Sequence, residues 1–136
     1  MLRIALGLFI VLHGLVHLWY FTLSRGLVAF QPEMGWTGRS WLLSGLLGEA
    51  TTRSLASVLY VVATAGLVAG GAGLLLQQGW WRPVVTGAAA FSAVVIVLFW
   101  DGNTAMLVQK GLLGLLINVA ILVALVALGW PPPEAL

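Results

Sequence analysis

The sequence predicts an all-α fold, an integral membrane four-helix bundle, and three observations support this prediction. Of the 136 residues, 61% are hydrophobic and only 7% are charged, whereas soluble domains carry about 25% charged residues. The hydrophobic residues form blocks of roughly 20, the length that crosses a hydrocarbon core of about 30 Å. Tryptophans stand at the ends of these blocks, at the depth that an amphipathic ring prefers in a bilayer. We therefore expect one transmembrane domain, residues 1–136, with lipid as its solvent.

Four membrane spans are predicted, and each is bounded by recognisable end signals. The second span is expected to be capped by Thr51 or Thr52, and the fourth by Asp101 with Asn103, because short polar side chains accept hydrogen bonds from free helix amides. Gly129 and the prolines after it end the fourth span. The expected spans are residues 2–21, 52–76, 81–100 and 103–128.

The only long connection, residues 25–50, is predicted to contain a short helix on the membrane surface. This helix is expected between Ser40 and Gly48, where apolar residues alternate with serine and glycine. Long loops in compact domains are often functional lids, so the connection either covers the mouth of the bundle or anchors it to the surface. The candidate lid residues are Glu33, Trp36 and Trp41.

The distribution of basic residues favours a cytoplasmic position for this connection. With four spans, both termini lie on one side of the membrane and residues 25–50 lie on the other. The side of the connection carries more Lys and Arg, and the positive-inside rule places such a side in the cytoplasm. Its basic residues are Arg25, Arg39, Arg53 and Lys110, against Arg3, Arg82 and the amino terminus on the other side, a difference of one positive charge. Lys110 is expected to snorkel to the interface.

Small residues recur at heptad spacing on the first two spans. Gly7 and Gly14 are seven residues apart, and Ser57, Thr64 and Gly71 repeat the same period. Small side chains let helix backbones approach closely in lipid, where hydrophobicity gives no contrast between helices. This pattern predicts helix packing and carries no chemistry.

His13 and His17 are the sharpest functional feature of the sequence. They lie four residues apart within the first apolar block, a spacing that places both imidazoles on one helix face. Ionisable side chains at membrane depth are costly and usually face a functional interior. A histidine, with an ordinary pKa of about 6.5, can also gain and lose a proton near neutrality.

Depth along the spans predicts where polar side chains meet. His13 and Thr64 lie near the midplane, Asn118 reaches a similar level, and His17 and Tyr60 lie nearer the side of the connection. We therefore expect a polar pocket that opens toward that side, lined by these five residues. The alternative is structural, since a buried Asn118 can act as interhelical glue worth about 1 kcal/mol.

A metal centre is not expected at the histidine pair. Two histidines one helical turn apart could supply two zinc ligands, but the carboxylates Glu33, Glu49 and Asp101 fall at or beyond the interface. A metal site would therefore need a carboxylate of the long connection, Glu33 or Glu49, to fold over the pair. The chain has no cysteine, which excludes disulfides and thiolate ligands. No basic cluster is present, so nucleic acid is not an expected partner, and no cofactor is assigned.

The opening of the first span resembles that of DoxX-like small four-helix bacterial membrane proteins. Those proteins commonly begin with an arginine, a glycine four residues later and a phenylalanine shortly after, and Arg3, Gly7 and Phe9 stand at the corresponding places. Phe9 comes one position early, and the second histidine and the long connection depart from the pattern. The resemblance covers the first helix and the four-span plan, and it implies an inner-membrane protein associated with quinone-linked redox chemistry.

Three functional classes stay open at this point, and the sequence does not decide whether the chain is an enzyme. One is a membrane-embedded enzyme or redox accessory that acts on a lipophilic molecule such as a quinone. The second is a small proton-coupled transporter, and the third is a non-catalytic assembly subunit of a membrane complex. Four helices enclose little volume, so a homo-oligomer or a larger complex is expected.

Overall fold

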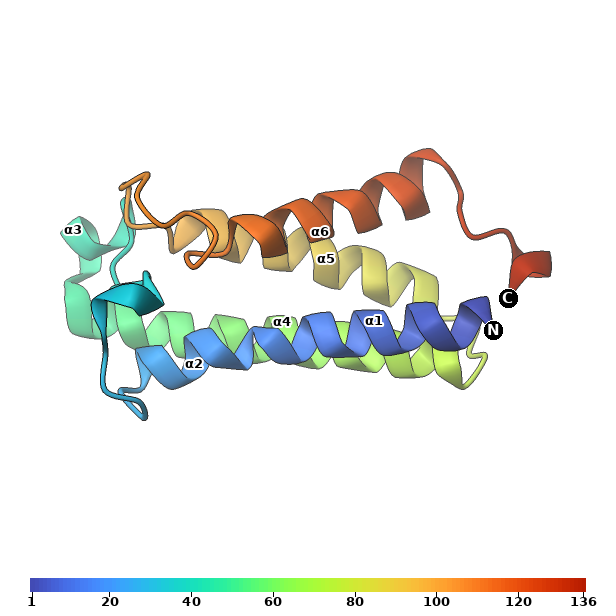
Figure 1. Cartoon of the computed structure of the whole chain (residues 1–136), viewed down its shortest axis with the longest axis horizontal. Coiled ribbons are helices and arrows are strands. Elements are labelled where there is room, and N and C mark those ends of the chain that lie inside the picture. The colour runs from blue at the N-terminus through green and yellow to red at the C-terminus, as the bar shows by residue number, and fades with distance from the viewer.

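The computed structural model describes residues 1–136 as an all-helical chain folded into two layers of antiparallel helices (Figure 1). Helix α1 (Leu2–Val16) continues in the same direction as α2 (Leu18–Ser24), and together they lie beside α4 (Glu49–Leu75). Helices α5 (Trp81–Leu98) and α6 (Leu112–Leu122) form the other layer. Helix α4 packs on α5, and α5 packs on α6, whereas α1 does not pack closely against α6.

Three helical segments are long and apolar enough to cross a membrane. They are Leu2–Ser24, Glu49–Leu75 and Trp81–Leu98, and they agree with the first three predicted spans to within three residues at each end. Helix α6 and the π-helical turn that continues it, Val123–Ala127, form a shorter apolar helix of residues Leu112–Ala127.

The predicted start of the fourth span, at residue 103, is wrong by nine residues. Residues 103–111 form successive turns, and α6 begins only after Gly111, which adopts a left-handed conformation with φ of +106°. Asp101 and Asn103 do accept backbone N–H bonds, but from Asn103 (2.9 Å) and Ala105 (2.8 Å) within these turns. Their capping therefore stabilises a loop instead of a helix end.

The predicted cap of the second span is also corrected. Helix α4 begins at Glu49 after Gly48, whose φ of +79° favours glycine. The Thr52 hydroxyl lies inside the first turn and donates to the Gly48 carbonyl at 2.7 Å.

The long connection holds two short helices, η1 (Pro32–Met34) and α3 (Leu43–Leu47). The predicted short helix is thus present, although it spans only five residues. Ser40 Oγ accepts the N–H of Leu43 at 3.0 Å and donates to the carbonyl of Leu98 at 2.5 Å. These bonds fasten the connection to the end of α5.

Two apolar clusters fill the interior at different depths. One surrounds Tyr20, Trp36 and Tyr60 at the end that holds the long connection. The other surrounds Leu67 and Val85, nearer the end where both chain termini lie (Figure 1). The polar side chains described next lie on the helices between these two clusters.

Candidate functional site

His13 and His17 lie on the buried face of the first helical rod. The imidazoles meet edge to face with centroids 5.2 Å apart. Both side chains are buried, with 7% and 2% of their surface exposed, and the same face carries the buried residues Gly7, Ile10 and Gly14. Helical spacing therefore turns the pair toward the interior, as predicted from the sequence.

The pair is joined to α5 and α6 by two fully buried side chains, Ser92 and Asn118. His13 Nε2 lies 2.8 Å from Asn118 Oδ1, and His17 Nε2 lies 2.5 Å from Ser92 Oγ. Asn118 Nδ2 donates to Ser92 Oγ at 2.7 Å, and His17 Nδ1 lies 3.0 Å from the carbonyl oxygen of His13. These four residues form a closed ring of hydrogen bonds, which we call the His–Ser–Asn network.

The network fixes which ring nitrogens carry protons when both imidazoles are neutral. A carbonyl oxygen only accepts, so His17 Nδ1 must donate, and His17 Nε2 is then an acceptor. Ser92 therefore donates its hydroxyl proton to His17 and accepts from the Asn118 amide. Asn118 Oδ1 is left as an acceptor, so His13 Nε2 donates to it. His13 Nδ1 consequently keeps an unprotonated lone pair.

That lone pair has no partner within the protein. No hydrogen bond involves His13 Nδ1, and the atom is not among the sealed, unpartnered side-chain atoms of the chain. His13 lines a pocket of about 310 Å³ between α1 and the segment around α6, here called the lateral pocket. His13 thus lines this pocket and also carries one hydrogen-bond acceptor, Nδ1, that no protein atom satisfies.

The lateral pocket is apolar apart from His13, His17 and Tyr20. Its other lining residues include Phe9, Leu12, Val16, Val108 and Leu113. These five side chains are also exposed on the outer surface of the helices, so the pocket opens sideways, between α1 and α6. Because the surrounding surface is apolar, a molecule that enters from this side must itself be lipophilic.

Tyr60 and Thr64, the other two predicted site residues, lie deeper and do not line the pocket. The ring of Tyr60 is 6.2 Å from that of His17 and stacks on Tyr20 at 4.8 Å. The Thr64 hydroxyl donates to the Tyr60 carbonyl at 2.9 Å, within α4 itself. The structure therefore brings His13, His17 and Asn118 together. Tyr60 packs near the His17 ring without a hydrogen bond to the network, and Thr64 lies where α4 packs against Gly14 of α1.

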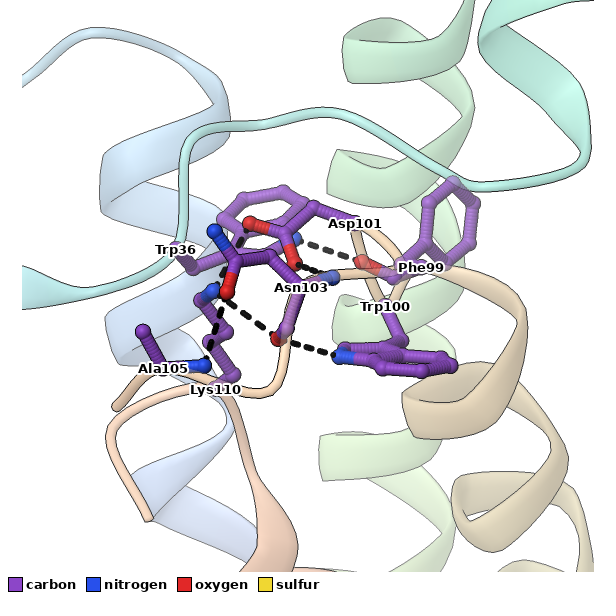
Figure 2. Close-up of polar contacts among 7 residues, drawn as sticks. All are labelled: Trp36, Phe99, Trp100, Asp101, Asn103, Ala105 and Lys110. Atoms are coloured by element: carbon purple, nitrogen blue, oxygen red, sulfur yellow. Dashed lines mark hydrogen bonds and ion pairs between the residues drawn. The ribbon is translucent and has the colours of Figure 1, made fainter. Parts of the chain in front are cut away.

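The three predicted lid residues take different positions. Trp36 is almost completely buried and meets Tyr20 and Tyr60 edge to face, each at 5.9 Å. Its indole N–H donates to the Phe99 carbonyl at 2.7 Å (Figure 2). Glu33 and Trp41 are exposed. Trp36 thus belongs to the aromatic cluster at this end of the bundle and does not line the lateral pocket.

Sequence reasoning missed Ser92 and misplaced Lys110. Ser92 is one of two hydroxyl residues, with Thr86, in the apolar third span, and only this rarity of hydroxyl groups in the span could have indicated it.

Lys110 does not snorkel: it pairs with Asp101 at 2.9 Å, and only 5% and 9% of the two side chains are exposed. Its ammonium group also donates to the Asn103 carbonyl at 3.2 Å (Figure 2). The pair fastens the turns that lead into α6.

No group of three His, Asp or Glu side chains in the chain could hold a metal ion. No protein family, curated protein or solved structure matches this chain. The relation to DoxX-like proteins therefore stays a prediction, and the site itself must carry the functional argument.

Proposed function

We propose that the chain is a four-span membrane protein that binds a lipophilic hydroxyl compound, such as a quinol, in the lateral pocket. The single observation that carries this proposal is that His13, which lines an apolar, sideways-facing pocket, has an unpaired Nδ1 lone pair. An acceptor in such surroundings favours a ligand that donates a hydrogen bond, because an acceptor that meets only apolar groups costs free energy.

Three apolar helices support the membrane location, and α6 is proposed as the fourth span. With its π-helical turn, α6 is shorter than a standard span, and the turns of residues 103–111 extend it toward the side of the long connection. A bacterial inner membrane, with this connection in the cytoplasm, is the location that the positive-inside rule favours. Association into a homo-oligomer or a complex stays a prediction.

The packing on both sides of the His–Ser–Asn network argues against the transport alternative. Toward the termini, the path is filled by the apolar cluster around Leu67 and Val85. Toward the long connection it is filled by Tyr20, Tyr60 and Trp36. A transporter of polar solutes requires a polar path through both halves, and the described conformation has apolar and aromatic side chains in each.

The assembly-subunit alternative treats the network as a structural clasp. Such a clasp would leave every polar atom of the network satisfied by another protein atom, since unsatisfied polar groups destabilise a membrane interior. His17, Ser92 and Asn118 meet this condition, whereas His13 Nδ1 does not. The histidine pair therefore fits ligand binding better than packing alone.

The test compares a hydroquinone that carries an alkyl tail with its dimethyl ether, which cannot donate a hydrogen bond. Binding is measured by tryptophan fluorescence in lipid nanodiscs under anaerobic conditions. The wild-type protein should bind the hydroquinone about tenfold more tightly, the value of roughly one hydrogen bond. The oxidised quinone, which is also only an acceptor, should behave like the ether.

His13→Gln is the matched variant for this test. A glutamine amide can reach the place of Nε2 and donate to Asn118, but it offers nothing at the place of Nδ1. The preference for the hydroquinone should disappear in this variant. Leu12→Ala is the control, because loss of an apolar contact weakens both ligands alike. An unchanged preference in His13→Gln, or no binding of either ligand to the wild type, would contradict the proposal.

A further inference from the structure

The two termini lie near the turn between α4 and α5, at the end of the molecule opposite the long connection (Figure 1). Residues of these three segments line a second pocket. Its volume is about 340 Å³, and we call it the terminal pocket. Its lining combines three polar side chains, those of Arg3, Gln77 and Gln78, with Gly79 and the apolar residues Leu74, Trp81, Pro133 and Leu136. It shares no lining residue with the lateral pocket.

Arg3 enters this pocket with unsatisfied hydrogen-bonding capacity. Its Nε atom is buried and has no partner. The two ion pairs of the chain are Arg39–Glu49 and Lys110–Asp101, so no carboxylate neutralises Arg3. A buried guanidinium N–H without an acceptor is unfavourable, and an anion in the pocket would supply one.

The position of Arg3 at the start of α1 makes the binding of an anion there more favourable. Arg3 stands in the first turn of the helix, where the backbone dipole is positive and a cation is destabilising. This turn has no acidic residue, and no side chain caps its free N–H groups. Guanidinium and helix end therefore present positive charge together, which is the arrangement that binds phosphate groups.

The surroundings add neutral hydrogen-bonding side chains, and a second arginine, Arg82, follows the lining residue Trp81 without lining the pocket itself. Arg82 lies over the ring of Trp81, 5.2 Å from its centroid, and donates to the carbonyl of Pro131, so it also lacks a carboxylate partner. Gln77 holds an unusual backbone conformation with φ of +57°, and that turn brings Gln77 and Gln78 to the rim of the pocket. Tryptophans at this end match the depth of lipid headgroups.

We propose that the terminal pocket binds the phosphate of a net-anionic phospholipid headgroup, with Arg3 as its principal ligand. A lipid source is favoured over a free phosphate ion because the pocket lies at the end of three apolar helices, at the level of headgroups. An arginine without a carboxylate partner, in the first turn of a helix, favours a headgroup with net negative charge over a zwitterionic one. This site is independent of the function proposed for the lateral pocket.

The test measures retention of lipid by the delipidated full chain, using native mass spectrometry after mixing with phosphatidylglycerol or phosphatidylcholine. Wild-type protein should prefer phosphatidylglycerol, and Arg3→Gln should reduce this affinity about tenfold, as for loss of a charge-assisted hydrogen bond. Arg3→Lys keeps the charge but removes the fork geometry, so it should recover only part of the affinity.

Arg25→Gln is the matched control, since Arg25 is exposed at the other end of the molecule and the charge change is the same. An equal loss in Arg25→Gln, or no loss in Arg3→Gln, would overturn the proposal, because binding would then follow overall charge alone. Inorganic phosphate that displaces the lipid at equal concentration would overturn the lipid assignment. Unchanged helicity and thermal unfolding of Arg3→Gln should show that the variant is folded.

Discussion

The two sides of α1 differ in how they meet their neighbours. Toward α4, backbones approach so closely that a Cβ added at Gly71 would lie 2.9 Å from the Gly7 carbonyl and 3.0 Å from the amide of Val11. Toward α6, the helices are bridged by the hydrogen bond from His13 to Asn118, and the lateral pocket lies beside this bridge. Small residues thus let α1 and α4 pack without a gap. On the other side, the hydrogen-bonded side chains of His13 and Asn118 span the distance between α1 and α6.

This difference separates the closely packed side of α1 from the side that carries the proposed ligand site. The α4 side buries small groups and leaves no room for a ligand, so its role is stability. The α6 side keeps a pocket and a free acceptor, and it depends on α6 being held at a distance. The turns before α6, fastened by Lys110 and Asp101, are part of that support (Figure 2). Substitutions on the α4 side should therefore lower the stability of the fold, whereas some substitutions on the α6 side should change ligand binding with little loss of stability.

The largest effect is expected for Asp101→Asn, which leaves the buried ammonium group of Lys110 without its counter-charge. Loss of one partner of a buried ion pair destabilises proteins by about 3–5 kcal/mol. The free energy of unfolding, measured in mixed micelles with increasing SDS, should fall by that order. Glu49→Gln is the control: its pair with Arg39 is 61% and 63% exposed, and exposed pairs contribute little. Similar losses in both variants would contradict a structural role for the Lys110 pair.

Gly71→Ala should rank second, because the new methyl group meets backbone atoms of α1 that cannot move aside easily. Overpacking of this kind costs about 1–3 kcal/mol. Gly87→Ala serves as the comparison, since a Cβ there meets nothing within 4 Å and should leave unfolding unchanged. If Gly71→Ala unfolds like the wild type under the same conditions, the close α1–α4 contact does not stabilise the fold.

Asn118→Leu should destabilise the α6 side by about 1–2 kcal/mol, since His13 Nε2 and Ser92 Oγ both lose a partner. The same substitution should also weaken ligand binding, because the orientation of the His13 ring is no longer fixed. Combined with Ser92→Ala, it should cost less than the sum of the two single variants, as residues of one network are not additive. Additive losses would show that Ser92 and Asn118 act separately.

His13→Gln should have the smallest effect on stability, within about 0.5 kcal/mol, because the bond to Asn118 can be retained. Its effect should appear in ligand binding instead, as the lost preference for a hydroquinone. Thermal unfolding and binding measured on the same preparation would separate the two. A large loss of stability with an unchanged ligand preference would assign His13 to packing.

The sequence by itself determined the features that depend on local pattern. Block length and hydropathy predicted three apolar helices to within a few residues, since a helix that crosses lipid must be apolar along its whole length. Helical periodicity placed His13 and His17 on one buried face. The heptad glycines correctly marked the face of α1 that meets α4, because a missing side chain is itself a local signal of close approach.

The tertiary structure decided which side chains meet. Ser92 lies 75 positions from His17, and Asn118 lies 105 positions from His13. Their contacts depend on the rotation of α5 and α6 about their axes. The sequence of a single apolar helix does not determine this rotation, because all its faces are similarly apolar. The start of α6 was decided in the same way: local residues allow a helix from 103, but the buried Lys110–Asp101 pair and the left-handed Gly111 stabilise turns instead. The free lone pair of His13 exists only because those distant partners fix every other proton in the network.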